Sequence, residues 1–451
     1  MKKSVTIGAV SLLLATPALA QKPTIEQVMQ ELNALGARVG RLEQDNAQLK
    51  TENAALQAEN DRLEATSEYL KDNATATRKQ LAQDAPKVAE AERITKGAEW
   101  ASRISWKADT RYRHEFVEPE EATSDQTRHR IRARLAMTAK INDTLTGTIG
   151  IATNGGSGDP RSTNQTLGEG WTRKGIGLDL AHVDWKPVES LTLSFGKMPQ
   201  PWYKTTGSSL FFDNDINPEG IALKFATGPF FASAWGYWLS ESSGSTDATM
   251  LGGQLGATGQ IGGMKLTGAI GYYDVGSVQG KVTTTSVTPA CAARPAFFGG
   301  PQGNTTVLDA AGCPVLANDF NVLDALAQAE FTVANQPMAI FVQYLQNNEA
   351  DDLDTGYLAG FTWGRASNPM TWEFGYMYGV SEKDAQFGQF VDSDFAGGIT
   401  DTDGSVFRIG FAPARNWVLN GTYFMNSRFI DAPGATESDY DRYQVDLNWK
   451  F

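Results

Sequence analysis

The sequence predicts an all-β transmembrane barrel of about 16 antiparallel strands, preceded by an α-helical coiled coil. Three observations carry this prediction. Apolar and polar residues alternate in short segments over residues 99–451. The connections between these segments alternate between short and long, and residues 25–70 repeat apolar positions every seven. Mean hydropathy is only −0.33, but a barrel hides its apolar half by alternation, so this value does not argue against it.

The first twenty residues have the pattern of a secretory signal. Lys2 and Lys3 precede an apolar run, and Ala18 and Ala20 supply small residues at a cleavage site. The run is too short for a spanning helix, and no later stretch is long enough. We therefore assign 1–20 as a signal peptide and expect the mature chain to be exported.

Residues 21–72 are predicted to form a coiled coil in the periplasm. The narrow two-in-seven pattern cannot be buried within one chain, so it predicts self-association over a rod of roughly 70 Å. Asn at the a position fixes the register of the helices and, with Leu at the d position, favours a two-stranded coiled coil. The seam positions are a Ile25, Leu32, Val39, Asn46, Asn53, Asn60 and Ser67, and d Val28, Leu35, Leu42, Leu49, Leu56, Leu63 and Leu70.

Residues 73–98 form an expected connector with some helix, and 99–451 the barrel. The period-two pattern places the strands at 103–116, 127–141, 144–153, 175–186, 190–198, 219–227, 229–239, 248–259, 263–275, 319–334, 337–347, 355–365, 370–380, 404–412, 416–427 and 439–451. The alternation changes face between Leu180 and Ala181, which predicts a β-bulge. Short and long connections keep strict parity, which a soluble β-sandwich, the rival fold, has no reason to do.

The inward face of the predicted first hairpin is rich in arginine. Helical spacing would scatter these residues, whereas strands align them. Like charges on neighbouring strands repel, so loop acids, wall carboxylates such as Asp109 and Glu115, or mobile anions must offset them. The predicted constriction residues are Lys107, Arg111, Arg113, Arg128, Arg130, Arg132 and Arg134 from the strands, with Asp213, Asp215 and Glu219 opposite them.

The segment 199–218 combines aromatic, proline and acidic residues, which is unusual for a solvated loop and predicts that it packs against something. Arginines that face acids across a constriction set up a transverse field and favour anions. The alternative is that the arginines are neutralised wall residues that set no selectivity.

An opening strand rich in Arg and Tyr, an Arg-alternating second strand, Gly196 and Lys197 with two prolines after them, and residues 213–220 together resemble the putative-porin family of Gram-negative outer membranes. The last strand, which ends in Phe451, is also similar to the final strands of such barrels. The resemblance implies that the third outer loop narrows the lumen, that the barrels associate as a homotrimer, and that the protein is a porin for small hydrophilic solutes.

Outside the predicted constriction, few residues suggest further chemistry. In an oxidising compartment Cys291 and Cys313 are expected to form a disulfide, although two free thiols are the alternative. His114 and His129 alternate with the arginines and are expected to face outward. The run 154–159 could bind Ca²⁺ but lacks EF-hand spacing, so no cofactor or metal is assigned. No nucleophile signature suggests an enzyme.

The sequence is consistent with three classes of function. A diffusion channel leads, with a structural tether to the cell wall and an adhesin as rivals. The expected partners are outer-membrane lipid, lipopolysaccharide, other copies of the chain, small solutes and, through the stalk, peptidoglycan. A net charge of −13 argues against nucleic acid.

Overall fold

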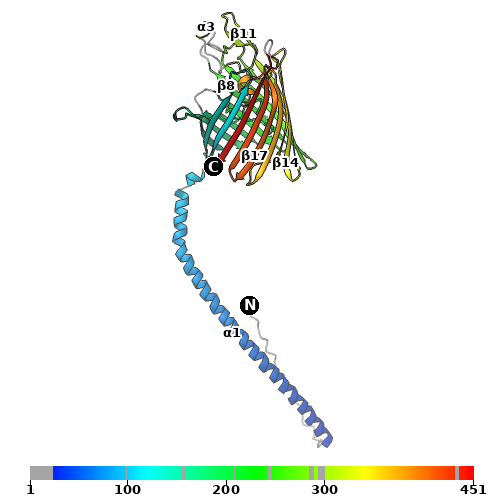
Figure 1. Cartoon of the computed structure of the whole chain (residues 1–451). Helices are drawn as coiled ribbons and strands as arrows, with labels where there is room; N and C mark the ends of the chain where they lie inside the picture. The colour runs from blue at the N-terminus through cyan, green and yellow to red at the C-terminus, as the bar shows by residue number, and fades with distance from the viewer. Residues whose placement is uncertain are drawn as a thin grey trace. The chain divides into compact units, whose positions relative to one another are not determined.

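The computed structural model describes residues 24–97, 99–153, 159–207, 209–241, 246–283, 289–292, 300–431 and 436–451. The predicted signal peptide, 1–20, lies outside them. The chain divides into two compact units, Met1–Ala98 and Glu99–Phe451. Figure 1 shows a long helix in the first unit and a barrel in the second.

The first unit contains one helix, α1 (Ile25–Gly97), of 73 residues. It continues through the region expected to be a connector and contains Pro86. The seam side chains are exposed and pack against none of the other described residues; Leu49 and Leu56 are 55% and 59% exposed. A one-sided apolar stripe on a single helix therefore remains uncovered, as the heptad pattern requires. None of the described helices is both long and apolar enough to span a bilayer.

The second unit begins with a short helix, α2 (Glu99–Ser102), followed by the barrel. Seventeen strands form one sheet, and β4 has only two residues. The other sixteen close the barrel, because β1 pairs with β19 from Asp109 opposite Lys450 to Pro119 opposite Tyr440. The strands are β1 (Ile104–Pro119), β2 (Gln126–Lys140), β3 (Leu145–Thr153), β4 (Gln165–Thr166), β5 (Ile176–Val188), β6 (Leu191–Lys197), β7 (Glu219–Thr227), β8 (Phe230–Ser240), β9 (Ala248–Ile261), β10 (Met264–Gly276), β13 (Phe320–Val333), β14 (Gln336–Asn347), β15 (Thr355–Gly364), β16 (Thr371–Ser381), β17 (Thr402–Ala414), β18 (Trp417–Arg428) and β19 (Ser438–Lys450).

The predicted barrel is confirmed, and each predicted strand overlaps an observed one. Neighbours in sequence pair antiparallel, with short turns at one rim and longer connections at the other. The C-terminus lies at the rim with the short turns, and β11 and α3 lie at the opposite one (Figure 1). Alternate residues face outward, as the exposure of Leu255 and Ile270 (70% and 63%) shows.

The predicted bulge lies in β5, one residue earlier than expected. Leu180 is opposite Gly150 and Leu178 is opposite Ile151, so Asp179 is the extra residue. A bulge redirects its side chain, and Asp179 Oδ1 accepts a hydrogen bond of 2.9 Å from Asn217 Nδ2 in the long connection before β7. This contact brings the wall and that connection together.

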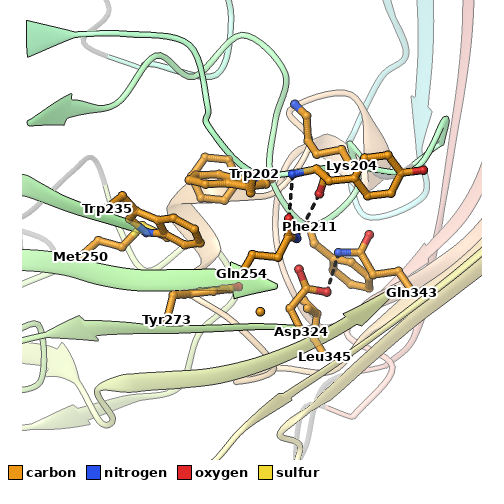
Figure 2. A pocket seen from close by; sticks show the side chains of 13 residues that line it. Trp202, Lys204, Phe211, Trp235, Met250, Gln254, Tyr273, Asp324, Gln343 and Leu345 are labelled. Atoms are coloured by element: carbon orange, nitrogen blue, oxygen red, sulfur yellow. Dashed lines mark hydrogen bonds between the residues drawn. The ribbon is translucent and has the colours of Figure 1, made fainter. Parts of the chain in front are cut away.

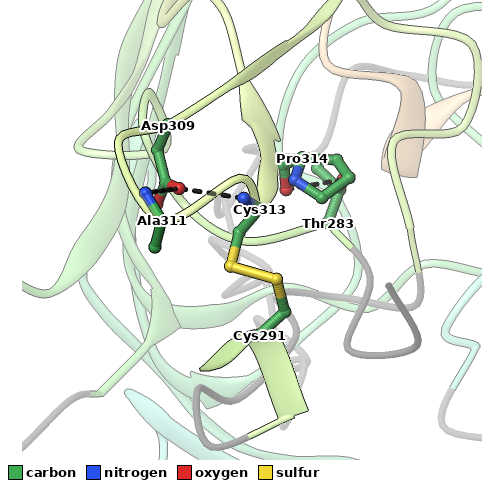
Figure 3. Close-up of a disulfide and its surroundings, with 6 residues drawn as sticks. All are labelled: Thr283, Cys291, Asp309, Ala311, Cys313 and Pro314. Atoms are coloured by element: carbon green, nitrogen blue, oxygen red, sulfur yellow. Dashed lines mark hydrogen bonds between the residues drawn. A yellow bond between two sulfur atoms is a disulfide. The ribbon is translucent and has the colours of Figure 1, made fainter. Parts of the chain in front are cut away.

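The connection between β10 and β13 contains α3 (Pro289–Ala292) and a small hairpin of β11 (Thr306–Leu308) and β12 (Pro314–Leu316). Cys291 and Cys313 form a disulfide with their Cα atoms 5.5 Å apart (Figure 3). Both cysteines are buried beside Val282 and Val315. The disulfide thus stabilises a small cluster of its own outside the barrel wall.

The outward alternation can be tested on β9. Leu255 lies near the middle of this strand, whereas the equally outward Ile261 is its last residue. Arginine at the bilayer midplane of a barrel costs about 2–4 kcal/mol, but about 0–1 kcal/mol near the interface. We expect Leu255→Arg to lower the free energy of unfolding in lipid vesicles by about 2 kcal/mol or more. Ile261→Arg is the matched control, and an equal loss in both variants would contradict a lipid-facing β9.

Candidate pore constriction

An apolar core fills part of the barrel interior. It combines wall residues from β7 to β18 with aromatic residues of two long connections, 198–218 and 382–401, which we call loop A and loop B. Loop B contains two short 3-10 turns, η1 (Gly388–Phe390) and η2 (Phe395–Gly397). Phe212 of loop A contacts Phe390 of loop B with ring centroids 4.7 Å apart. Both loops therefore fold into the lumen and pack against each other.

The wall is shaped to receive loop A. A Cβ added at Gly356 would lie 2.8 Å from Phe211 Cε1, and one at Gly379 would overlap Leu210. Figure 2 shows Gln254 beneath the loop, where it donates to Tyr203 O at 3.1 Å and accepts from Tyr203 N at 2.8 Å. A wall side chain thus satisfies loop backbone groups in the way a neighbouring strand would.

Little empty space remains under loop A. The cavity between it and the wall measures about 20 Å³, roughly one water molecule. Figure 2 shows Trp202, Trp235 and Tyr273 around this space, with Asp324 accepting a hydrogen bond of 2.9 Å from Gln343. This half of the lumen is therefore closed by packing.

The other half of the lumen is charged. Seven arginines on β1, β2 and β19 form a basic surface that we call the arginine wall, comprising Arg111, Arg113, Arg128, Arg130, Arg132, Arg134 and Arg442. Three wall carboxylates and two loop carboxylates lie within 4.0 Å of it, namely Asp109, Glu115, Asp446, Asp215 and Asp394. Like charges on adjacent strands are thus interleaved with acids, which offsets their repulsion.

Loop A supplies one acid to the arginine wall. Asp215 Oδ1 lies 3.3 Å from Arg134 Nη1, and Asp109 bridges Arg132 and Arg134 at 2.9 Å from each. Asp213 lines the same cavity as the arginines, but it forms no ion pair with any of them among the described residues. It is buried and accepts hydrogen bonds from Asp215 N at 2.8 Å and Ser393 N at 2.9 Å. Its role is to join loop A to loop B.

Loop B supplies the acid that sequence reasoning missed. Asp394 lies 2.7 Å from Arg113 Nη1 and 2.7 Å from Arg442 Nη1. Burial alone would raise the pKa of Asp394, but the charges of Arg113 and Arg442 outweigh burial and hold it well below its usual range. Loop B, like loop A, carries Phe and Asp together, and this shared composition was the signal that could have found it.

The predicted wall carboxylate Glu115 pairs with the arginine wall, whereas the predicted loop acid Glu219 lies away from it. Glu115 is fully buried and pairs with Arg128 at 2.7 Å and Arg130 at 3.6 Å. Glu219 pairs with Lys197 at 3.0 Å with its side chain 64% exposed, and it lines neither of the cavities described next. The outward histidines contact each other, with the rings of His114 and His129 4.9 Å apart.

Two cavities meet at Arg134 and Asn214, which line both. The first, of about 440 Å³, lies between the arginine wall and loops A and B and includes Asp394. The second, of about 380 Å³, is lined by Lys107, Asp109 and Asp179. The two cavities therefore share an arginine of the wall and a polar residue of loop A.

A third connection joins the first cavity. Arg161, in the long connection before β5, is buried, donates to Gly398 O of loop B at 2.7 Å and pairs with Asp159 at 3.0 Å. Of the run considered for Ca²⁺, residues 154–158 lie outside the described residues, and Asp159 is held by Arg161.

A closed barrel of sixteen strands with infolded loops and a charged constriction defines the porin class of outer-membrane barrels. The sequence comparison is consistent with this class: residues 116–309 match the family model described as putative porin, so the resemblance inferred from the sequence is confirmed. No curated protein sequence matches the chain.

Solved structures with a similar fold are outer-membrane proteins. The high-pH structure of Pseudomonas putida OprB is 12% identical with a TM-score of 0.51, covering 78% of this chain and 96% of that one. Salmonella typhi OmpF in complex with daunomycin has 12% identity and a TM-score of 0.47, covering 77% and 97%. The OmpT loop L8 deletion mutant of Vibrio cholerae has 11% identity and a TM-score of 0.46, covering 77% and 100%. At such identity the likeness to OprB establishes the fold alone; together with the family match it supports an outer-membrane location.

The junction of loops A and B predicts a pH effect. Burial, followed by the charges of Asp392 and Asp215, raises the pKa of Asp213 well above its usual 3.8. Burial likewise raises the pKa of Asp392, and it lowers the pKa of the nearby Lys204 to about 8. A carboxyl group whose pKa is higher in the docked loop than in the undocked loop contributes its full stabilisation at pH values below the undocked pKa. That contribution is lost as the pH rises through the docked pKa.

We therefore expect hydrogen exchange in residues 210–216, corrected for intrinsic rates, to be faster at pH 8 than at pH 5. Asp213→Asn removes the titrating group and is expected to flatten this dependence. Asp352→Asn, in an exposed loop, is the control. An unchanged pH dependence in Asp213→Asn would show that the junction does not depend on this carboxyl.

Proposed function

We propose that the protein is a porin, a water-filled diffusion channel for small hydrophilic solutes across the outer membrane. The observation that carries the proposal is the charged cavity of about 440 Å³ inside a closed barrel, which shares Arg134 and Asn214 with a second cavity. Porin channels are polar passages through barrels of this size. An anchor without transport has no need of charged residues held in its interior at the cost of desolvation.

A mild preference for anions follows from the charges at the constriction. Seven arginines of the arginine wall face five paired carboxylates, which leaves an excess of two positive charges. Arginine remains protonated at any physiological pH. Fixed charge in a narrow, partly desolvated passage favours solutes of opposite sign.

Removing two charges from the arginine wall tests this preference. In Arg130→Ala with Arg132→Ala, the carboxylates of Glu115, Asp109 and Asp215 lose partners. A unit charge about 4 Å away in water contributes on the order of 1 kcal/mol. We expect the anion-to-cation permeability ratio, obtained from reversal potentials in a salt gradient, to fall by about fivefold.

The control for that experiment replaces two exposed arginines in short turns, Arg365→Ala with Arg415→Ala. It should leave the ratio unchanged. If the arginine-wall variant also retains the parental ratio, the arginines are neutralised wall residues and the anion preference is wrong. If the parental protein gives no conductance, the structural tether is the better supported function.

The stalk adds self-association to the channel. Helix α1 exposes an apolar seam over residues 25–70, and such a seam is ordinarily buried against copies of itself. We propose a homotrimer with the stalk in the periplasm, where the helix would span about 110 Å at 1.5 Å per residue. Because a helix of this length could extend from the outer membrane towards the cell wall, we propose a tether to peptidoglycan as a second role.

Substitutions in the seam test the stalk. We expect Leu49→Asp with Leu56→Asp to dissociate the full-length protein in detergent or to lower its association constant at least tenfold, because two buried layers become charged. Gln48→Asp with Ala55→Asp adds the same charges at outer heptad positions and should not. Sedimentation of both proteins gives their masses, and a trimer that survives the seam variant would mean that the barrels alone hold it together.

A further inference from the structure

One arginine of the lumen stands apart from the ion pairs of the arginine wall. Arg408, on β17, alternates with the outward residues Phe407 and Ile409 and lines the 440 Å³ cavity. It has no hydrogen bond, and no carboxylate within 4 Å, among the residues that the structure describes. A guanidinium carries five donors, so Arg408 offers all of them to the cavity.

A second arginine on the same cavity, Arg111, has an incompletely compensated charge. Arg111 Nη2 donates to Asn164 Oδ1 at 2.6 Å, but its Nε is buried without a partner. Its nearest carboxylate, Asp446, lies 3.7 Å away. Both oxygens of Asp446 are already occupied by Arg113, at 2.7 and 2.9 Å. Arg111 is therefore buried with incomplete charge compensation.

The four acids that line the cavity have other partners, and Asp213 among them accepts from Asp215 N and Ser393 N. Asp394 bonds Arg113 and Arg442, and Asp215 accepts from Thr163 and lies against Arg134. Asp392 accepts hydrogen bonds from Ser209 Oγ and from the backbone N–H of Asp394, each at 2.9 Å. The unused hydrogen-bonding capacity of the cavity is therefore donor capacity, and an unpartnered buried donor has a free-energy cost that a ligand can remove.

We propose that this cavity binds a small oxyanion carrying two negative charges, of the class of inorganic phosphate, through Arg111 and Arg408. The proposal rests on the proposed channel and deepens it by naming a solute class. The planar fork of arginine matches two oxygens of a tetrahedral oxyanion, and an ionised acceptor strengthens each bond. A singly charged anion neutralises only one of the two arginines and is held more weakly.

The test measures chloride current through the full-length protein in planar bilayers while inorganic phosphate is added. Bound phosphate should reduce the current saturably. Arg408→Gln and Arg111→Gln should each raise the half-blocking concentration by about tenfold, since each removes a charge-assisted contact. Arg415→Gln, in the exposed turn after β17, should not change it. Acetate, with one charge, should block only at much higher concentration.

Failure of this inference is separable from failure of the channel. A conducting protein that phosphate does not block, or one blocked equally in all three variants, overturns the phosphate site and leaves the channel intact. Block by acetate at the same concentration overturns the requirement for two charges. A silent bilayer overturns the channel, and calorimetric titration of the detergent-solubilised protein with phosphate, which should show binding weakened in Arg408→Gln, then decides the site.

Discussion

The structure depends on how seven arginines are accommodated inside a closed barrel. Guanidinium groups on adjacent strands repel, and burying each of them costs several kcal/mol unless it is paired and hydrogen-bonded. The wall's own carboxylates, Asp109, Glu115 and Asp446, satisfy part of this requirement. The rest comes from loops A and B, through Asp215 and Asp394. Charge in the wall therefore requires loops in the lumen.

Ion pairs alone would not hold two long loops in water. The apolar core does so, because Phe211 and Phe212 of loop A and Phe387 and Phe390 of loop B are buried against the far wall. Each such side chain contributes about 1.5–3 kcal/mol on burial. The lumen is thus divided into a packed half, which fixes the position of the loops, and a charged half, which remains available to solutes. The position of each loop acid follows from the packed half.

The local sequence pattern was sufficient to predict the strands of the barrel wall, but it was insufficient to predict the contacts of the charged site. Period-two alternation finds the sixteen strands of the barrel wall because each is decided by its own residues, but it misses the short strands β4, β11 and β12 in the long connections. The change of phase in β5 reveals the bulge. The pairing of Arg113 with Asp394 joins residues 281 apart in sequence, and no local pattern encodes it. Composition alone could not separate Asp215, which faces the arginine wall, from Asp213, which bonds the backbone of loop B. The helical residues after 72 lack the heptad seam. They nevertheless continue α1 as far as Gly97, and Pro86 does not end the helix.

An even number of strands has a further consequence for where function can reside. Because β1 pairs with β19, the chain enters and leaves the barrel at one rim, and Phe451 N donates to Ala108 O there at 3.0 Å. Every long connection then falls at the other rim, since antiparallel neighbours alternate direction. The connections that carry Arg161, Asp215 and Asp394 all come from that rim. Among the described residues the short turns send no loop into the lumen, and the second cavity is lined by Lys107 and Asp179 of the wall and by Asn214 and Asn217 of loop A. In the proposed channel, the residues that set selectivity therefore belong to the side of the long loops, and the exposed arginines of the short turns lie outside both cavities.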